Sequence, residues 1–146
     1  TVPDDHRTIL NIHFCIPQRY KHPYFVGLIG GAAHWIFARG HLASVTISAA
    51  NLTSNGEITD IVDLLWQEVC IALGHEGLKM GAYRILTEKR ATFTQSPDQL
   101  KRRPYQKTEW SNLILAGDWV NTGLPATIEG SVKSGRTAAD YILNNA

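Results

Sequence analysis

The sequence predicts an α+β fold: a mostly antiparallel sheet with a packed helix, plus a C-terminal strand–helix unit. Three observations lead to this prediction. Apolar residues alternate with polar ones along most of the first fifty positions, as they do in half-buried strands. The apolar period then becomes helical, and later a short apolar run leads into a second helical segment.

The first fifty residues predict four strands, with a hairpin turn at Gly30 and Gly31 between the second and the third. Leu10, Ile12 and Phe14 lie on one side of the first, with His13 and Cys15 on the other. A polar loop over 18–23 should follow this strand. The four predicted strands cover residues 9–16, 24–29, 34–38 and 42–49.

A helix is predicted next, with Ser54 or Thr59 as its N-cap and Gly74 as its stop signal. Residues 83–93 read as a long strand, and the polar stretch 95–110, which holds two prolines, reads as an extended loop.

The C-terminal part predicts a strand followed by a helix. Residues 113–116 form an apolar run typical of a short buried strand, and residues 125–143 have helical spacing. One stripe of this helix should pack on the sheet: Ile128, Val132, Gly135, Ala139 and Ile142.

Composition excludes several classes of protein. The apolar fraction of 44% and the charged fraction of 18% are typical of a folded globular chain. A net charge of +1, with no large basic block, argues against nucleic acid as the main partner. No apolar run approaches the ~20 residues of a membrane-spanning helix. The chain opens at Thr1 without methionine, which indicates a piece of a longer protein.

The cysteines and histidines give no sign of a disulfide framework or a metal site. Cys15 and Cys70 lie far apart without metal-ligand spacing, so we expect reduced thiols and a cytoplasmic protein. The six histidines lack the spacing of zinc motifs, and we expect no metal.

The glycine-rich stretch "GLIGGAAHWIF" invites comparison with nucleotide-binding loops. Its glycines, at 27, 30 and 31, match neither the dinucleotide fingerprint nor the phosphate-binding loop, and the residues that follow are typical of a strand. A hairpin turn is the favoured interpretation.

The stretch "GDWVNTGLPATIEG" combines features of a ligand site. Asp118 follows the apolar run, where a carboxylate can accept hydrogen bonds from the hydroxyls of a polyol. Gly117 permits a sharp turn and a close ligand approach. Pro125 suits the first helical position, and the amides that follow it, of Thr127, Ile128 and Glu129, would attract an anion.

Each of these features also has an ordinary structural explanation. Asp118 could cap a turn, Pro125 could open any helix, and Gly130 and Gly135 could serve packing. A glycine inside a helix costs about 1 kcal/mol relative to alanine, so two of them in one helix require a reason. Gly130 would leave room for a flat ring against the backbone. Their coincidence with the aspartate and the proline favours a ligand site.

The run "LILAGDWVNTGLPATIEGSVKSGRTAADYI" resembles the C-terminal flavin-binding motif of the flavin amine oxidase and phytoene desaturase superfamily. Upstream, "AHWIFARGHLASVTISAA" and "EKRATFTQSP" resemble a narrower group, the squalene-associated FAD-dependent desaturases or hydroxysqualene dehydroxylases. The resemblance extends from about residue 9 to the end of the chain.

This resemblance implies that Asp118 binds the ribityl chain of FAD and that Ala126 to Glu129 face the pyrimidine edge of the flavin. Trp119 is the aromatic residue expected nearest the ring. It also implies that residues 1–110 belong to the substrate domain and 111–146 to the FAD-binding domain. The N-terminal dinucleotide-binding half is absent, so we expect this chain alone to retain FAD weakly or not at all.

The resemblance further implies an oxidoreductase that removes the hydroxyl of hydroxysqualene to give squalene, with an apolar isoprenoid substrate taken from a membrane surface. His13 and Arg90 are candidate substrate-lining residues, with ordinary sheet positions as the alternative. No catalytic acid or base is assigned. Two other functions stay open: a carotenoid-type desaturase or amine oxidase, and a non-enzymatic ligand-binding domain.

Overall fold

The computed structural model describes residues 1–50 and 55–145, which form two compact units. One unit comprises Arg7–Ala91, here called the sheet unit. The other combines Thr1–His6 with Thr92–Ala146 and is called the loop–helix unit. This division reflects contacts between residues of the chain itself. The predicted division into 1–110 and 111–146 concerns contacts with substrate and cofactor, and it stays a prediction.

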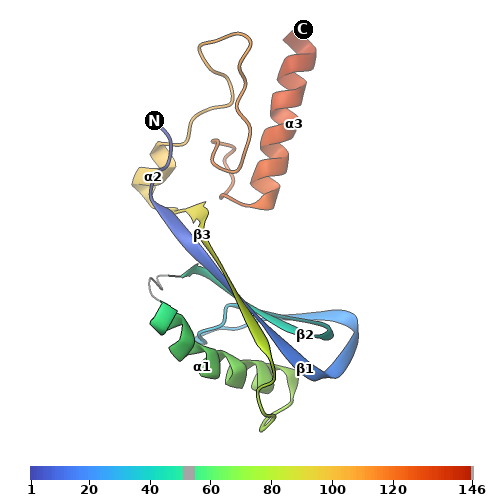
Figure 1. Ribbon diagram of the computed structural model, residues 1–146. Coiled ribbons are helices and arrows are strands. Elements are labelled where there is room, and N and C mark those ends of the chain that lie inside the picture. The colour runs from blue at the N-terminus through green and yellow to red at the C-terminus, as the bar shows by residue number, and fades with distance from the viewer. Residues whose placement is uncertain (51–54, 146) are drawn as a thin grey trace. The chain divides into compact units, whose positions relative to one another are not determined.

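A three-stranded sheet in the order β2-β1-β3 supplies the framework of the sheet unit (Figure 1). The strands are β1 (His6–Gly27), β2 (Trp35–Ala50) and β3 (Tyr83–Phe93). β1 and β2 form one long antiparallel hairpin. The α+β class and the strand over residues 83–93 are confirmed.

The four short strands predicted for the first fifty residues are two long ones. The segment 18–23, predicted as a loop, continues β1, because register shifts between Cys15 and Tyr20 and between Tyr20 and Tyr24 absorb its irregular residues. Bulges of this kind bend a strand without ending its pairing, and they are where a strand tolerates proline, here Pro17 and Pro23.

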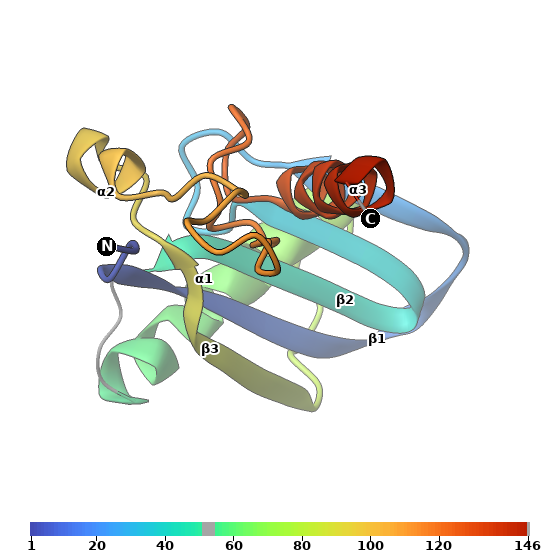
Figure 2. The same cartoon turned by 90° about the horizontal axis from the view of Figure 1, so that it is seen from above.

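Helix α1 (Asn55–Leu73) covers one face of this sheet, as the view from above shows (Figure 2). It ends as predicted: Gly74 has a φ of 68°, and the His75 amide donates to the Cys70 carbonyl at 2.7 Å. Of the two residues proposed as its N-cap, Ser54 lies outside the described residues, and Thr59 lies inside the helix, so the prediction of Thr59 as the cap is wrong.

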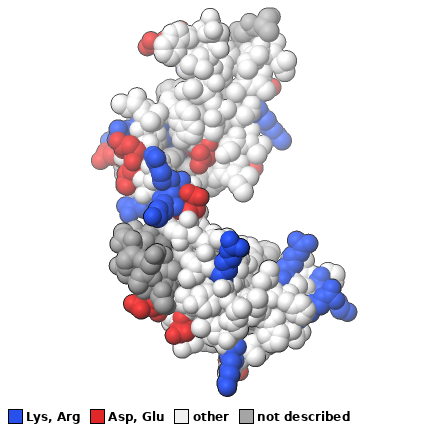
Figure 3. All heavy atoms as spheres, viewed as in Figure 1, with Lys and Arg blue, Asp and Glu red and all other residues white. Residues whose placement is uncertain are grey.

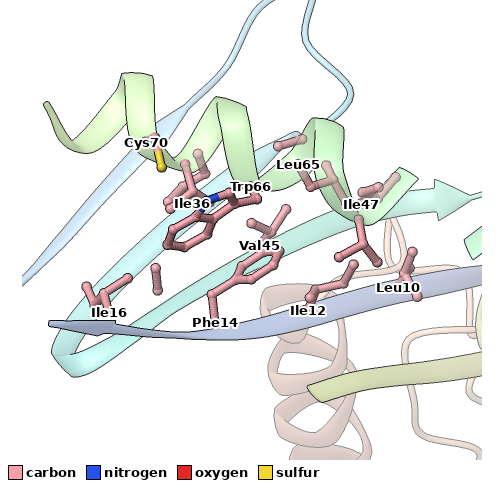
Figure 4. Packing of buried hydrophobic residues seen from close by; sticks show 14 residues of the cluster. Leu10, Ile12, Phe14, Ile16, Ile36, Val45, Ile47, Leu65, Trp66 and Cys70 are labelled. Carbon is pink, nitrogen blue, oxygen red and sulfur yellow. The ribbon is translucent and has the colours of Figure 1, made fainter. Parts of the chain in front are cut away.

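The hydrophobic core lies between α1 and the sheet, and the predicted alternation of β1 is confirmed (Figure 4). Phe14 is fully buried, and its ring centroid lies 5.2 Å from that of Trp66 on α1. The remaining strand and helix residues labelled in Figure 4 surround this pair: Leu10, Ile12, Ile16, Ile36, Val45, Ile47, Leu65 and Cys70. The opposite face of β1, with His13, is left uncovered by α1.

The loop–helix unit contains a short helix that the sequence did not predict. α2 (Pro97–Lys101) interrupts the stretch expected to be an extended loop. Ser96 caps it by accepting from the Gln99 amide at 3.4 Å, and Pro97 occupies its first turn. The N-terminal segment packs here, since Asp4 pairs with Arg102 and with the Gln99 amide group.

The predicted buried strand at residues 113–116 is wrong. Only one isolated antiparallel bridge, Lys107 to Ile114, forms there, and Leu113 is 41% exposed. The backbone of this run is satisfied by local contacts instead of a strand ladder: the Leu113 amide donates to the Trp110 carbonyl at 3.2 Å, and the Leu115 amide donates to the Gln106 carbonyl at 2.8 Å.

The closing helix, α3 (Ile128–Asn145), buries a different face from the one predicted. Its covered residues are Gly130, Ser134 and Ala138. The predicted stripe faces outward, with Ile128 at 86% exposure and Ile142 at 55%. The stripe has helical spacing, but nothing in the described part of this unit covers it.

Candidate functional site

Gly117 shapes the turn that precedes the site. Its φ of 145° is one that residues with side chains rarely adopt. A Cβ at this position would lie 2.5 Å from Nε1 of Trp119, so the indole already fills the space that a side chain would take. The Gly117 amide donates to the fully buried Ser134 hydroxyl at 3.0 Å, which fastens the turn to α3. The missing side chain at position 117 therefore makes room for the Trp119 indole and not for a ligand.

Asp118 is half-buried on this turn, and its carboxylate accepts no hydrogen bond from any described residue. Its backbone carbonyl, by contrast, is held by Arg103. A fixed backbone with an unused carboxylate is the arrangement expected of a group that accepts hydrogen bonds from a ligand's hydroxyls.

Helix α3 begins later than the sequence predicted. Thr127 is its N-cap: the Thr127 hydroxyl accepts from the Gly130 amide at 3.2 Å, and its carbonyl accepts from the Ser131 amide at 3.0 Å. Pro125 lies two residues before the cap and does not occupy the first helical position. The amides of Ile128 and Glu129 open the helix, where intrahelical partners are lacking and the dipole is positive.

The close approach at Gly130 involves the protein's own backbone. A Cβ at Gly130 would lie 2.7 Å from the carbonyl oxygen of Pro125, so the glycine lets residues 122–127 fold back against the helix. Gly135, in contrast, has open space around its missing Cβ. Local packing therefore requires a glycine at position 130, whereas no contact within the described chain requires one at position 135.

Arg103 is the residue of this site that sequence reasoning missed. It is 7% exposed and donates to three carbonyl groups of the loop: Asp118 at 2.9 Å, Val120 at 2.5 Å and Leu124 at 2.7 Å. Its guanidinium carbon lies 5.6 Å from the centroid of the Phe93 ring. No motif marks it, because in the sequence it is one of three adjacent basic residues.

Burial lowers the pKa of the Arg103 guanidinium, and the negative charge of Asp118 partly opposes this change. Its Nε has no hydrogen-bond partner, and no carboxylate of the described residues forms a salt bridge with it. A buried positive charge therefore lies among the loop carbonyls, beside a hollow of about 470 Å³. The hollow is lined by Gln95, Leu100, Lys101, Arg103, Asn121, Gly123, Leu124 and Pro125.

The candidate substrate residues lie in the sheet unit and are not brought together. His13 faces the side of the sheet away from α1, with its Nδ1 2.7 Å from the Ser44 hydroxyl. It borders a mostly apolar hollow of about 440 Å³, together with Cys15, Leu42, Ala82, Tyr83, Arg84 and Leu86. Arg90 does not line this hollow.

The backbone amides of the glycine-rich turn bind a carboxylate of the protein itself. The amides of Ala32 and Ala33 donate to the two carboxylate oxygens of Glu68, each at 2.7 Å. Gly30, with a φ of 80°, makes the turn of the β1–β2 hairpin, as the sequence predicted. These amides are therefore already paired, which leaves no phosphate-binding role for this turn.

Charged groups and metal ligands are dispersed. On the face drawn in Figure 3, basic and acidic side chains form small groups separated by uncharged surface. Among the described residues, no three histidine, cysteine or acidic side chains are placed to hold a metal ion. None of the helices in the described ranges combines the length and apolarity needed to cross a bilayer.

Comparison with known proteins specifies the family to which this α+β chain belongs. The model of the flavin containing amine oxidoreductases matches residues 50–143. The chain belongs to this family, and the predicted resemblance is confirmed.

The chain is also similar to curated proteins over nearly its whole length. It is 43% identical over 143 residues to the hydroxysqualene dehydroxylase of Zymomonas mobilis, and 42% identical over 141 residues to that of Rhodopseudomonas palustris. These matches cover 98% and 97% of the chain but 34% of each relative. A 15-cis-phytoene desaturase of an Oncidium hybrid is 23% identical over 94% of the chain and 27% of its own length. The chain thus spans about a third of the length of these hydroxysqualene dehydroxylases.

Proposed function

We propose that this chain is the C-terminal part of an FAD-dependent oxidoreductase that converts hydroxysqualene to squalene. The identity of 41–43% to three hydroxysqualene dehydroxylases supports the substrate class. The observation that carries the cofactor assignment is the unused carboxylate of Asp118, held on a fixed turn that precedes the open N-terminus of α3 at Ile128.

The residues of the loop–helix unit suit one wall of a flavin site. Asp118 accepts hydrogen bonds from the ribityl hydroxyls, and the amides of Ile128 and Glu129 face the electron-rich pyrimidine edge. Trp119 packs on Gly117 and closes the turn. When bound, the flavin supplies hydride chemistry. These residues supply placement and a positive dipole, and none of them is assigned a proton-transfer role.

We propose that a dinucleotide-binding half of the same flavoprotein covers the exposed face of α3. Three apolar side chains of this face are strongly exposed: Ile128, Ile142 and Leu143, at 86%, 55% and 77%. The backbone of residues 113–116 is paired at a single bridge and offers an edge to a further strand. Burial of such a surface supports assembly with a partner of matching apolar character.

A direct test is FAD titration of this chain followed by flavin fluorescence. One wall of a cofactor site should bind FAD weakly or not at all, because the ADP half of the cofactor has no partner here. Tight, stoichiometric binding would overturn the proposal that the chain carries only part of the site.

We propose that the uncovered face of the sheet contributes to the substrate site. His13, which is hydrogen-bonded to Ser44, lines the hollow of about 440 Å³ together with Leu42 and Leu86, so a polar group adjoins apolar surface. That combination fits an isoprenoid alcohol, whose hydroxyl needs a hydrogen-bond partner and whose chain does not. In the flavoprotein, His13→Phe should raise the KM for hydroxysqualene. An unchanged KM would remove His13 from the substrate site. Arg90 is retained as a candidate only for its position on β3.

The phytoene desaturase match favours one alternative, an enzyme that oxidises a carotenoid precursor. The flavoprotein can be incubated separately with hydroxysqualene plus reduced flavin, with phytoene, and with amines. Water loss and squalene formation support the first proposal, whereas conversion of phytoene or an amine alone supports a desaturase or an amine oxidase. A chain that binds ligand without any turnover would be a binding domain.

Peripheral membrane contact is part of the proposal, because a C30 hydrocarbon reaches an enzyme from a bilayer. Exposed aromatic side chains on the β1–β2 hairpin support it: Phe25, Trp35 and Phe37 are 66%, 44% and 46% exposed. Aromatic residues of this kind favour the membrane interface. Failure of the flavoprotein to sediment with phosphatidylglycerol vesicles at low salt would exclude such contact.

A further inference from the structure

The loop between Asp118 and Leu124 is held at both ends by one side chain. Arg103 donates through Nη2 to the carbonyls of Asp118 and Val120, and through Nη1 to that of Leu124. A second link runs beside it, since the Asn121 amide donates to the Pro104 carbonyl at 2.8 Å. The segment 103–104 is therefore the support of the whole loop.

The hydrogen bonds from Arg103 satisfy backbone carbonyl groups that would otherwise lack a donor inside the loop. Val120 is fully buried, and within the described residues its carbonyl accepts a hydrogen bond from Arg103 alone. A buried carbonyl without a donor costs about 1–3 kcal/mol, and hydrogen bonds from a charged donor are the stronger kind. Loss of the guanidinium would affect three carbonyls at once.

The geometry of the donor also matters. A guanidinium is planar and presents a fixed fork of N–H groups, whereas a lysine ammonium is a compact point charge. The acceptors lie at positions 118, 120 and 124, so a single donor must reach both ends of the loop. The guanidinium carbon also lies over the Phe93 ring, 5.6 Å from its centroid.

We propose that Arg103 is the positioning residue of the flavin wall. By holding both ends of the loop it fixes where the Asp118 carboxylate points and where Pro125 leads the chain into α3. Arg103 is placed to act on the backbone and not on the cofactor. The inference rests on the proposed function, but its main test requires no flavin.

The test is hydrogen–deuterium exchange of the full 146-residue chain carrying Arg103→Met or Arg103→Lys, with Arg102→Met and Arg102→Lys as matched controls. Arg102 is the adjacent arginine and pairs with Asp4 instead of the loop. We expect exchange across residues 117–124 to rise roughly tenfold or more in both Arg103 variants, with α1 unchanged. Both Arg102 variants should leave residues 117–124 protected.

A spectroscopic measurement separates loop order from general stability. Iodide quenching of Trp119, taken as the difference from the Trp119→Phe background, should increase in Arg103→Lys at temperatures where circular dichroism shows that α3 is still folded. If Arg103→Met unfolds α3 altogether, Arg103→Lys decides: loosening confined to residues 117–124 supports the proposal. Unchanged exchange there, or equal loss of protection along α3, would overturn it. FAD binding by the wild-type chain has no bearing on either readout.

Discussion

The two glycines of α3 give a prediction in which substitutions of the same kind have opposite effects. Gly135→Ala places a methyl group in open space at an interior helical position. Alanine is preferred over glycine there by about 1 kcal/mol, so the variant should stabilise the loop–helix unit by that amount. Gly130→Ala places the same methyl group 2.7 Å from the Pro125 carbonyl oxygen.

The expected magnitudes follow from these environments. The clash at Gly130 is with backbone, so the loop before α3 must shift, and overpacking of this kind costs about 1–3 kcal/mol. That cost exceeds the helix-propensity gain, and the net effect is destabilising. For a unit of about 60 residues, 1 kcal/mol corresponds to a shift in Tm of about 4–8 °C.

The assay is thermal unfolding followed by circular dichroism, with exchange of the α3 amides to assign the transition to this unit. Gly135→Ala should raise the Tm and Gly130→Ala should lower it. A Gly130→Ala chain as stable as wild type, or a Gly135→Ala chain less stable, would refute the reasoning. In the complete flavoprotein the Gly135→Ala gain should shrink or reverse, because Gly135 lies on the stripe proposed to be covered.

Three further predictions concern the rest of the chain. A thiol reagent should label exposed Cys15 quickly and Cys70 only on unfolding, since Cys70 is buried and burial raises the pKa of its thiol; equal rates would contradict this. Hydrogen bonds from the Gln99 amide group and from Arg102 lower the pKa of Asp4, so its contribution is present above about pH 4 and is lost as the pH falls through the lowered value. Proteolysis of the N-terminal segment should therefore increase in acid, and Asp4→Asn should abolish that pH dependence. Glu68→Gln should cost about 1–3 kcal/mol of sheet-unit stability in urea unfolding, while Glu76→Gln, at an exposed position, should cost little.

Alternating and helical periods predicted the core well. Leu10, Ile12 and Phe14 are all buried, and α1 ends where Gly74 was expected to stop it. Strand boundaries in the first fifty residues were less predictable. Polar residues between positions 18 and 23 suggested a loop, but bulges let the strand continue through them.

The errors in the C-terminal part share one cause. The run 113–116 and the stripe through Ile128 and Val132 have the apolar character of buried elements, yet both are exposed or only partly covered here. Apolar periodicity indicates that a face will be covered without indicating by what. Within the described chain the cover is absent, which agrees with a chain that spans about a third of its relatives.

The sequence predicted which residues form the candidate site better than it predicted how they are arranged. The motif located the Asp118 turn and the start of a helix, but it placed that start at Pro125 in place of Thr127. It could not show that Trp119 fills the space at Gly117, because that contact depends on the fold of the loop. Arg103 was missed because charge in a polar stretch usually indicates exposure, and only the packing reveals it to be buried.

The central claim is that residues 117–130 form one wall of a flavin site through the Asp118 carboxylate. The most direct measurement is the FAD dissociation constant of the complete flavoprotein carrying Asp118→Ala, compared with Asp63→Ala at an exposed position of α1. Loss of hydrogen bonds to a charged acceptor should weaken FAD binding by roughly 10- to 100-fold, with the control unchanged. Wild-type affinity in Asp118→Ala would contradict the account.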